Sequence, residues 1–239
     1  MPPPMRPDGR ADDELRPITF ERHFNDHPEG SVLVSFGRTR VLCTACVEEG
    51  VPPWMERSGL GWVTAEYGML PGSTASRKMR EGRTGKADSR ALEISRFIGR
   101  CMRPVVDRKA IRDKTIWIDC DVLAADGGTR TAAVSGAYVA LHDAVSALKL
   151  PAWPLRHSVA AVSAGVVKGR IVLDLNYEED AKAEVDLNIA MTGEGKYIDV
   201  QGTAESHPFD DKTLEEIFRL ARLGVAEITT RQRLALEGK

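Results

Sequence analysis

The chain has 239 residues, of which 42% are hydrophobic and 28% are charged, and its net charge is −2. These values are typical of a soluble globular protein and exclude a disordered or fibrous one; the length suits one large domain or two small ones with a shared core. No stretch approaches the roughly 20 apolar residues of a membrane span, and the proline-rich start has no signal-peptide character. Four cysteines are too few for a disulfide framework in a chain this long, so we expect a cytoplasmic protein.

The first predicted elements form a β-hairpin. Residues 31–36 and 40–47 are short β-rich runs, joined by a turn at 37–39. Cys43 and Cys46 make a C-x-x-C pattern within the second run, but the second cysteine pair or nearby histidine that zinc would need is missing. We therefore expect these cysteines to pack in the core.

A helix and a strand follow a Pro- and Gly-rich break at residues 71–74. From Ser89 onward, apolar residues recur at helical spacing, with Ser89 as the expected N-cap and Pro104 as the stop. Residues 116–122 then alternate between apolar and polar, which predicts a strand with one buried face.

This strand ends at the turn of residues 126–128, and a second helix is expected beyond it. Apolar residues from Val134 to Leu148 recur at helical spacing, which predicts an amphipathic helix that runs to about Leu150. Residues 151–154 have the composition of a linker.

The second half repeats this organisation. Residues 159–167 and 170–175 flank a tight turn and predict another hairpin, followed by an acidic loop at 176–180. Residues 185–191 alternate, so this strand should place Asp186 on its polar face.

A returning strand and a long helix complete the chain. Residues 197–203 should pair back after a turn at 193–196, and apolar residues between Leu214 and Ile228 predict a C-terminal helix. Both halves thus contain a hairpin, an acidic loop, further strands and a helix. We expect an α+β protein built from a duplicated unit.

The most informative local pattern is Asp126-Gly127-Gly128-Thr129-Arg130-Thr131, between a strand and a helix. Its glycines allow backbone N–H groups to approach an anion closely, its threonines add hydroxyl donors, and Arg130 adds a planar charged fork. It is neither a Walker A loop nor a dinucleotide-binding fingerprint. The residues suit a phosphate site, but an ordinary glycine turn with Arg130 in solvent explains them equally well.

Three further residues are candidates for the same site. Arg90, at a predicted helix start, would be a second clamp if the fold brings the helix ends together; otherwise it is a surface arginine. Asp180 and Asp186 could ligate a magnesium ion or protonate a leaving oxygen. The alternative is that the acidic residues around Asp180 only solubilise a turn.

Covalent catalysis has little support, since the sequence contains neither a G-x-S-x-G nor an H-E-x-x-H motif.

The charges are unevenly distributed along the chain. Residues 77–112 contain twelve Lys or Arg and only four acidic residues, although the whole chain is almost neutral. Such a local surplus favours a basic face directed at RNA, DNA or phosphate over a solvated helix face of mixed charge.

Several long motifs, in register over nearly the whole chain, resemble the ribonuclease PH family, which is related to polynucleotide phosphorylase and the exosome ring. The segments that carry the resemblance are residues 5–10, 30–34, 62–71, 119–131 and 200–205.

The resemblance implies an RNase PH fold and a homo-hexamer arranged as a trimer of dimers. In this interpretation Met5 is the usual start, residues 1–15 are an extension and lead-in, residues 16–150 form the first half and residues 151–239 the second. It also implies a cytoplasmic, phosphorolytic 3′-to-5′ exoribonuclease that trims transfer RNA precursors. Inorganic phosphate would attack the last phosphodiester and release a nucleoside diphosphate, and the reverse reaction would add nucleotides to RNA 3′ ends.

The family's functional residues carry over onto matching positions. Arg90, Gly128, Thr129 and Arg130 match its phosphate ligands, and Asp180 and Asp186 match its catalytic carboxylates, which bind magnesium (or manganese) or act as general acid. Arg77 and Arg80 match basic positions of a loop that grips transfer RNA.

Gly72 departs from the arginine that usually follows Leu-Pro in bacterial relatives. The missing charge bears on the affinity for RNA and not on the chemistry.

Two rival functions remain: a non-catalytic RNA-binding ring subunit, which would typically lose the phosphate arginines or the aspartates, and a hydrolytic metal-dependent nuclease, which would need several clustered carboxylates.

Overall fold

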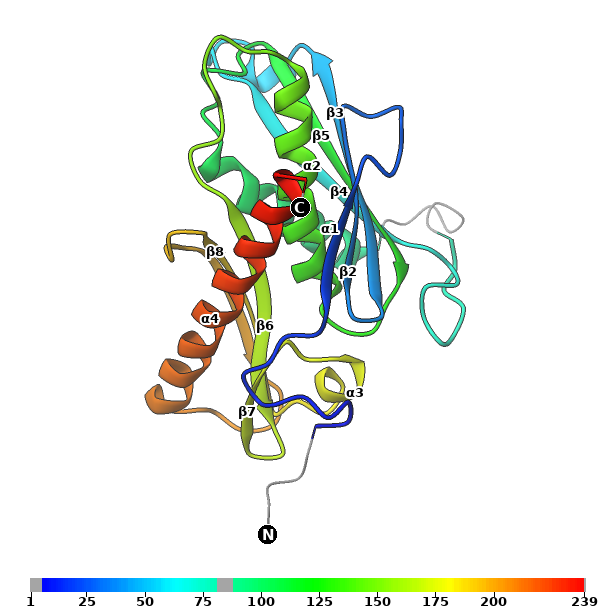
Figure 1. Ribbon diagram of the computed structural model, residues 1–239, viewed down its shortest axis with the longest axis vertical. Helices are drawn as coiled ribbons and strands as arrows, with labels where there is room; N and C mark the ends of the chain where they lie inside the picture. Colours follow the sequence, from blue (N-terminus) through cyan, green and yellow to red (C-terminus); the bar gives the residue numbers. More distant parts are fainter. Residues whose placement is uncertain (1–5, 81–87, 239) are drawn as a thin grey trace.

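The computed structural model describes residues 6–80 and 88–238, and their secondary structure falls into two sheets and four α-helices. The first sheet is mixed, with strand order β1-β2-β3-β5-β4, and the second is antiparallel, with order β7-β6-β8-β9. Figure 1 shows the first sheet on one side of α2 and the second sheet below it. The strands are β1 (Ile18–Arg22), β2 (Gly30–Phe36), β3 (Thr39–Glu49), β4 (Trp62–Met69), β5 (Lys114–Ala124), β6 (Val159–Val167), β7 (Arg170–Leu173), β8 (Val185–Thr192) and β9 (Tyr197–Ala204).

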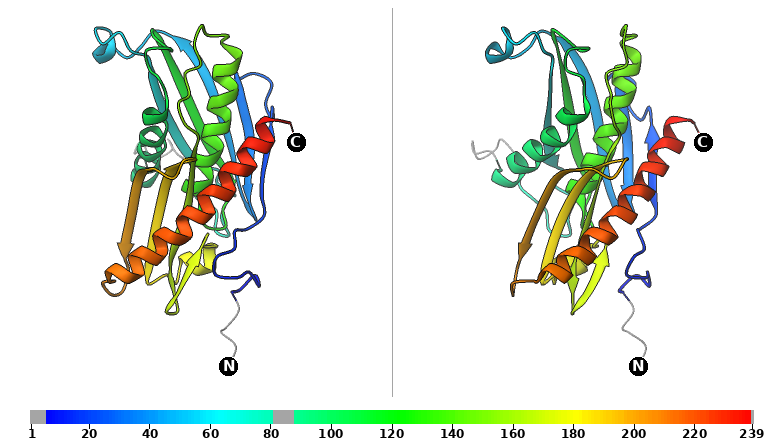
Figure 2. Two further views of the ribbon diagram at one scale, coloured as in Figure 1. Left: turned by 60° about the vertical axis from the view of Figure 1, so that its left-hand side comes forward. Right: turned by 90° about the vertical axis from the view of Figure 1, so that its left-hand side faces the viewer.

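The helices are α1 (Ser89–Met102), α2 (Thr129–Ala147), α3 (Tyr177–Asp180) and α4 (Asp211–Leu236), with short 3-10 turns at Pro53–Met55 and Arg103–Val105. α1 packs on β4, α2 packs on β2 and β3 as well as on β6, and α4 runs diagonally across β6 and β7 (Figure 2). The α+β class expected from the sequence is confirmed. No helix of the described chain combines the length and apolar composition that a membrane crossing needs.

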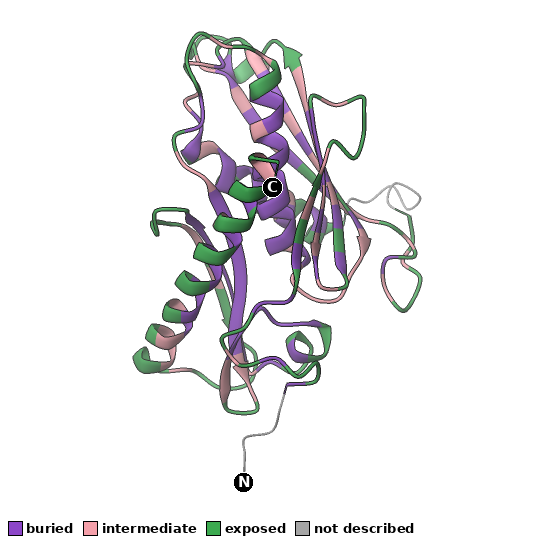
Figure 3. Ribbon diagram, in the orientation of Figure 1, coloured by how far each residue is buried: buried purple, intermediate pink, exposed green. Residues whose placement is uncertain are grey.

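The helix α2 differs from its prediction in both position and character. It begins at Thr129, earlier than the apolar pattern indicated, and it ends at Ala147. It is not amphipathic, because 15 of its 19 residues are buried. Only the C-terminal end of this helix, at Ser146 and Ala147, is exposed, and one continuous hydrophobic core spans the two halves around the helix (Figure 3).

Two other local predictions need correction. The N-cap of α1 is Asp88, because its side chain accepts a hydrogen bond from the Arg90 N–H, and Ser89 is already helical. The expected acidic loop at 176–180 contains the short helix α3. A capping box forms it: the Asn176 side chain accepts from the Glu179 N–H, and the Glu179 carboxylate accepts from the Asn176 N–H.

The expected hairpins are present, and they bury the cysteines unequally. β2 pairs with β3 and β6 pairs with β7, both antiparallel. Cys43 is fully buried opposite Cys120, whereas Cys46 is only half-buried.

Candidate functional site

One cleft brings together the six residues predicted to do chemistry. It has a volume of about 1250 Å³ and lies where the start of α2 faces α3, β8 and β9. Its lining includes Arg90, Gly128, Thr129, Arg130, Asp180 and Asp186. Residues far apart in the sequence, from both halves, therefore face one space.

The arginines predicted to contact RNA lie outside that cleft. Arg77 and Arg80 are exposed, whereas their neighbour Lys78 lines the cleft. Elsewhere in the basic segment, Arg90 lines the cleft, and Arg103 and Arg108 lie over the ring of Trp62. Residues 81–87 lie outside the described residues.

The glycine loop brings the two halves into close contact. Gly127 and Gly128 both have positive φ, at 77° and 66°, a conformation that side chains disfavour. A Cβ on Gly127 would lie 2.6 Å from the Asn176 carbonyl carbon, so only glycine allows this loop to pack against the segment that leads into α3. Gly127 thus contributes close backbone packing, and Gly128 forms the wall of the cleft.

The N-terminus of α2 faces the cleft without a side-chain cap. Its N-cap residue is Gly128, and within residues 6–80 and 88–238 no side-chain cap forms at this helix start. The helix dipole and the free N–H groups there favour an anion. The prediction that Thr131 donates a hydrogen bond to a bound anion is wrong, because its hydroxyl donates to the Gly128 carbonyl at 2.9 Å.

Thr129 is oriented by a partner that the sequence did not reveal. The Tyr67 hydroxyl of β4 donates to Thr129 Oγ1 at 2.8 Å, which leaves the Thr129 proton free for a ligand. Burial raises the pKa of Tyr67, so it remains a protonated donor. Tyr67 lies in a segment that carries the family resemblance, but no local pattern links it to Thr129.

The two arginines of the cleft differ in how they are held. The Arg130 guanidinium donates to Gln201 Oε1 at 2.9 Å. It also forms an ion pair with the Glu93 carboxylate, in which the shortest nitrogen–oxygen distance is 3.3 Å. The guanidinium of Arg90 has no hydrogen bond or ion pair to any part of the chain that the structure describes. Its backbone N–H donates to Asp88, which fixes the start of α1.

The carboxylates line the same cleft from the second half of the chain, and the pKa of each is raised. Burial and the charge of Asp180 raise the pKa of Asp186 to about 6, against partial relief from Asn188 and Arg130. Burial also raises the pKa of Asp180, while Arg90 and Arg130 oppose the rise. Asn188 donates to one oxygen of Asp186 at 3.0 Å, and the other oxygen is buried without a partner among the described residues.

This pair fits a magnesium ion only as a partial ligand set. No group of three or more His, Cys, Asp or Glu able to hold a metal occurs within residues 6–80 and 88–238. Magnesium is nevertheless often held by one or two carboxylates together with water and substrate phosphates. The unpartnered oxygen of Asp186 is consistent with such a ligand.

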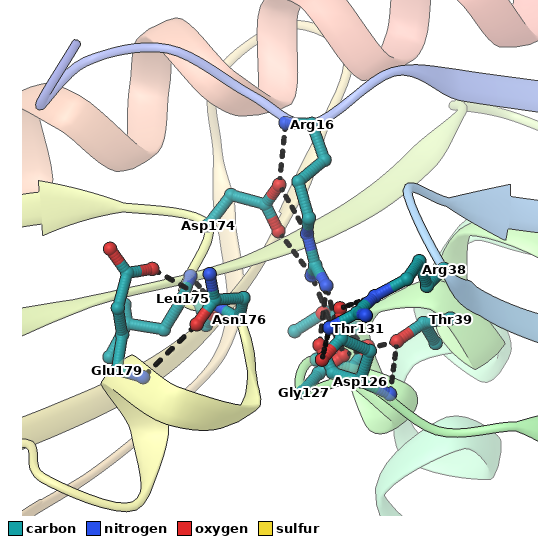
Figure 4. Close-up of polar contacts among 12 residues, drawn as sticks. Arg16, Arg38, Thr39, Asp126, Gly127, Thr131, Asp174, Leu175, Asn176 and Glu179 are labelled. Carbon is teal, nitrogen blue, oxygen red and sulfur yellow. Dashed lines mark hydrogen bonds and ion pairs between the residues drawn. The ribbon is translucent and has the colours of Figure 1, made fainter. Parts of the chain in front are cut away.

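A buried arginine cluster supports the cleft from behind, and sequence reasoning missed it. Arg16 binds both oxygens of Asp174, at 2.7 and 3.0 Å, and donates to the Asp126 carbonyl at 2.6 Å (Figure 4). Arg6 binds both oxygens of Glu179 at 2.7 Å. The N-terminal segment thereby ties the glycine loop to α3, and Glu179 is a buried structural residue rather than a solubilising one.

The turn of the first hairpin holds the same loop from the other side. Thr39 Oγ1 donates to the Gly127 carbonyl at 2.7 Å and accepts from the Asp126 N–H at 2.9 Å. Arg38 pairs with the Asp126 carboxylate at 3.0 Å (Figure 4). The backbone of the loop is thus fixed before any ligand binds.

Comparison with known proteins identifies the family. The model for domain 1 of the 3′ exoribonuclease family, RNase PH, matches residues 14–146, and the model for domain 2 matches residues 157–223. The structure of rice (Oryza sativa) Rrp46 is similar, with a TM-score of 0.80 at 18% identity, over 97% of this chain and 100% of that chain.

Two archaeal structures share the same fold. The Archaeoglobus fulgidus exosome with RNA bound to the active site has a TM-score of 0.79 at 20% identity, over 98% of this chain and 93% of that chain. An archaeal exosome core has a TM-score of 0.78 at 20% identity, over 96% and 91%. These similarities show a common RNase PH fold, and the two family models cover most of the sequence. The chain therefore belongs to the RNase PH family of 3′ exoribonucleases.

Proposed function

We propose that this protein is a phosphorolytic 3′-to-5′ exoribonuclease that trims the 3′ ends of transfer RNA precursors. The observation that carries the proposal is that both halves of the chain line one cleft with groups of different chemistry. The first wall, from α1 and α2, has the uncapped start of α2, Thr129 and two arginines; the second wall, from α3 and β8, has two carboxylates with raised pKa. The similar Archaeoglobus fulgidus structure, which has RNA in its active site, supports RNA as the substrate.

Inorganic phosphate would bind at the first wall. Phosphate attacking a phosphodiester brings two anions together, so their charge must be offset before the attacking oxygen can be aligned with the phosphorus. Arg90 and Arg130 supply that positive charge, and the backbone N–H groups from Gly128 onward, with the Thr129 hydroxyl, supply directed donors. No protein nucleophile is required.

The second wall would serve the leaving group. As a phosphate oxygen bonds to the last phosphorus, the bond to the preceding 3′ oxygen breaks and that oxygen needs a proton. With a pKa raised to about 6, Asp186 is protonated in a fraction of molecules near neutral pH and can donate it. The products are a nucleoside diphosphate and an RNA one nucleotide shorter.

As the alternative to this general-acid role, we propose that Asp180 and Asp186 in their ionised forms hold magnesium or manganese, which when bound offsets charge on the reacting phosphates. Arg77 and Arg80 would grip the transfer RNA outside the cleft, since both are exposed on the loop that leads into it. A cytoplasmic homo-hexamer, with residues 16–150 and 151–239 as the two halves of each subunit, completes the proposal.

The test is digestion of a transfer RNA precursor by the purified protein with and without inorganic phosphate. We expect nucleoside diphosphates that appear only with phosphate. Nucleoside monophosphates formed without phosphate would show a hydrolytic nuclease. RNA binding without any product would show a non-catalytic ring subunit, and either result would refute the proposal.

A further inference from the structure

The guanidinium of Arg130 is held by residues from two other elements. Its Nη1 donates to Gln201 Oε1 of β9 at 2.9 Å. The carboxylate of Glu93, on α1, faces the same end of the guanidinium, with Nη1–Oε1 3.4 Å and Nη2–Oε2 3.3 Å. Arg130 itself lies in the first turn of α2, so three elements meet at this side chain.

These contacts use one edge of a planar group that has two. A guanidinium has five N–H donors in a rigid fork, and its side edge, formed by Nε and the second Nη2 hydrogen, can bind two oxygens of one anion. Glu93 contacts both terminal nitrogens of Arg130 and Gln201 contacts Nη1, whereas Nε has no partner within the described part of the chain. The side edge is left for a ligand.

We propose that Glu93 and Gln201 are positioning residues, which fix the Arg130 guanidinium so that its side edge faces bound phosphate. The inference rests on the proposed function in one respect, that the ligand of the cleft is inorganic phosphate. It assigns no chemistry to either residue, since both act through Arg130.

Arg90 provides an internal contrast. Its guanidinium has no partner in the described residues, so none of them offsets the cost of ordering that side chain when a ligand binds. Arg130 meets most of that ordering cost during folding, because Glu93 and Gln201 already hold it. The two phosphate arginines therefore differ: other described side chains orient Arg130 before a ligand binds, and none of them orients Arg90.

Charge neutralisation of Arg130 by Glu93 would change the phosphate affinity in the opposite direction. Glu93 is negatively charged, and if it chiefly neutralised Arg130, its removal would tighten phosphate binding. Its side chain is 44% exposed, and its distances to Arg130 exceed the roughly 2.7–2.9 Å of a strong charge-assisted bond, so water screens much of its charge. Gln201 is uncharged, so its removal tests positioning without this electrostatic effect.

The experiment measures phosphate affinity in Glu93→Ala, Gln201→Ala and Glu93→Gln variants. Isothermal titration with inorganic phosphate gives the Kd, and phosphorolysis kinetics give the KM for phosphate and kcat. We expect each alanine variant to raise Kd and KM about 5- to 10-fold, the cost of ordering one side chain on binding, with kcat at saturating phosphate within about 2-fold. Glu93→Gln should recover most of the affinity, because its amide oxygen still accepts from Arg130.

A matched control separates positioning from loosened docking of β9 on α1. Asp199 of β9 pairs with Arg100 of α1 at 2.9 Å but does not contact Arg130. Asp199→Ala should leave the phosphate Kd unchanged. An equal loss of affinity in this variant would show that docking, and not the orientation of Arg130, sets the affinity, and would overturn the proposal.

Four further results would each refute the positioning role, the proposed function or both. Tighter phosphate binding by Glu93→Ala, or unchanged binding in both alanine variants, would overturn the positioning role. Wild-type protein that binds phosphate, with the expected affinity pattern, but releases no diphosphates would refute the proposed function and leave the positioning role intact. Wild-type protein that does not bind phosphate would refute both.

Discussion

The glycine loop of the cleft and the neighbouring loop at residues 71–80 present their charges in opposite ways. The glycine loop, which precedes Arg130 in the chain, is fixed from both sides by Arg16 and by Thr39. The loop at 71–80 is anchored at Ser73 and Lys78 by backbone hydrogen bonds, but Arg77 and Arg80 extend into solvent. The contrast indicates that chemistry depends on a prepared frame, whereas the grip on RNA depends on exposed charge.

The largest effect should come from the cleft itself. Asp186→Asn keeps the size of the side chain but removes the proton donor, and positioned proton transfer contributes about 10²–10⁴-fold to a rate. We expect kcat to fall by that factor while RNA affinity, measured by filter binding, changes little. A variant within 3-fold of wild-type kcat would remove Asp186 from the reaction.

The frame behind the cleft can be broken without touching the cleft lining. Asp174→Ala leaves Arg10 and Arg16 buried without their shared carboxylate, which should cost about 3–5 kcal/mol in the free energy of unfolding. Urea denaturation measures this cost. Glu216→Ala, which breaks an exposed pair with Arg219, is the control and should cost far less. Equal losses would mean that the buried arginine cluster does not brace the fold.

The raised pKa of Asp186 predicts a pH-dependent stability. Because its folded pKa of about 6 lies above its ordinary value of 3.8, the folded state binds the proton more tightly, and the contribution of Asp186 to stability is lost as pH rises from 4 to 6. Asp186→Asn should therefore stabilise the protein by about 3 kcal/mol at pH 7.5 and by little at pH 4. Chemical denaturation at both pH values, with a chelator present, measures the difference, and equal gains at the two values would contradict the shift.

The smallest effect should come from the exposed loop. Gly72 is exposed, and a side chain there would meet no other atom within 4 Å. Gly72→Arg should tighten transfer RNA binding a few-fold and steepen its salt dependence by about one unit of log–log slope, since one more phosphate contact releases one more counterion. Binding titrations across a range of salt concentrations test this, and an unchanged slope would show that position 72 does not face RNA.

Much of this arrangement could be predicted because its signals are local. The alternation at residues 185–191 placed Asp186 on the polar face of β8, and that face lines the cleft. The glycine pattern before Arg130 predicted an anion site at a helix start, where the structure has the uncapped end of α2.

The remainder depends on contacts between distant residues. Arg16 and Asp174 are 158 residues apart, and Arg130 and Gln201 are 71 apart, so no periodicity or spacing relates them. The same limit explains the error in α2: its apolar pattern is that of a helix, but only the second sheet shows that both of its faces are buried.

The central claim, that inorganic phosphate itself attacks the RNA, has a direct test in the fate of the phosphorus atom. The protein is incubated with a transfer RNA precursor and ³²P-labelled inorganic phosphate, and the released nucleotides are separated and counted. Phosphorolysis predicts label in the β-phosphate of nucleoside diphosphates, lost in both Arg90→Ala and Arg130→Ala. Unlabelled nucleotides released at the wild-type rate would contradict the account.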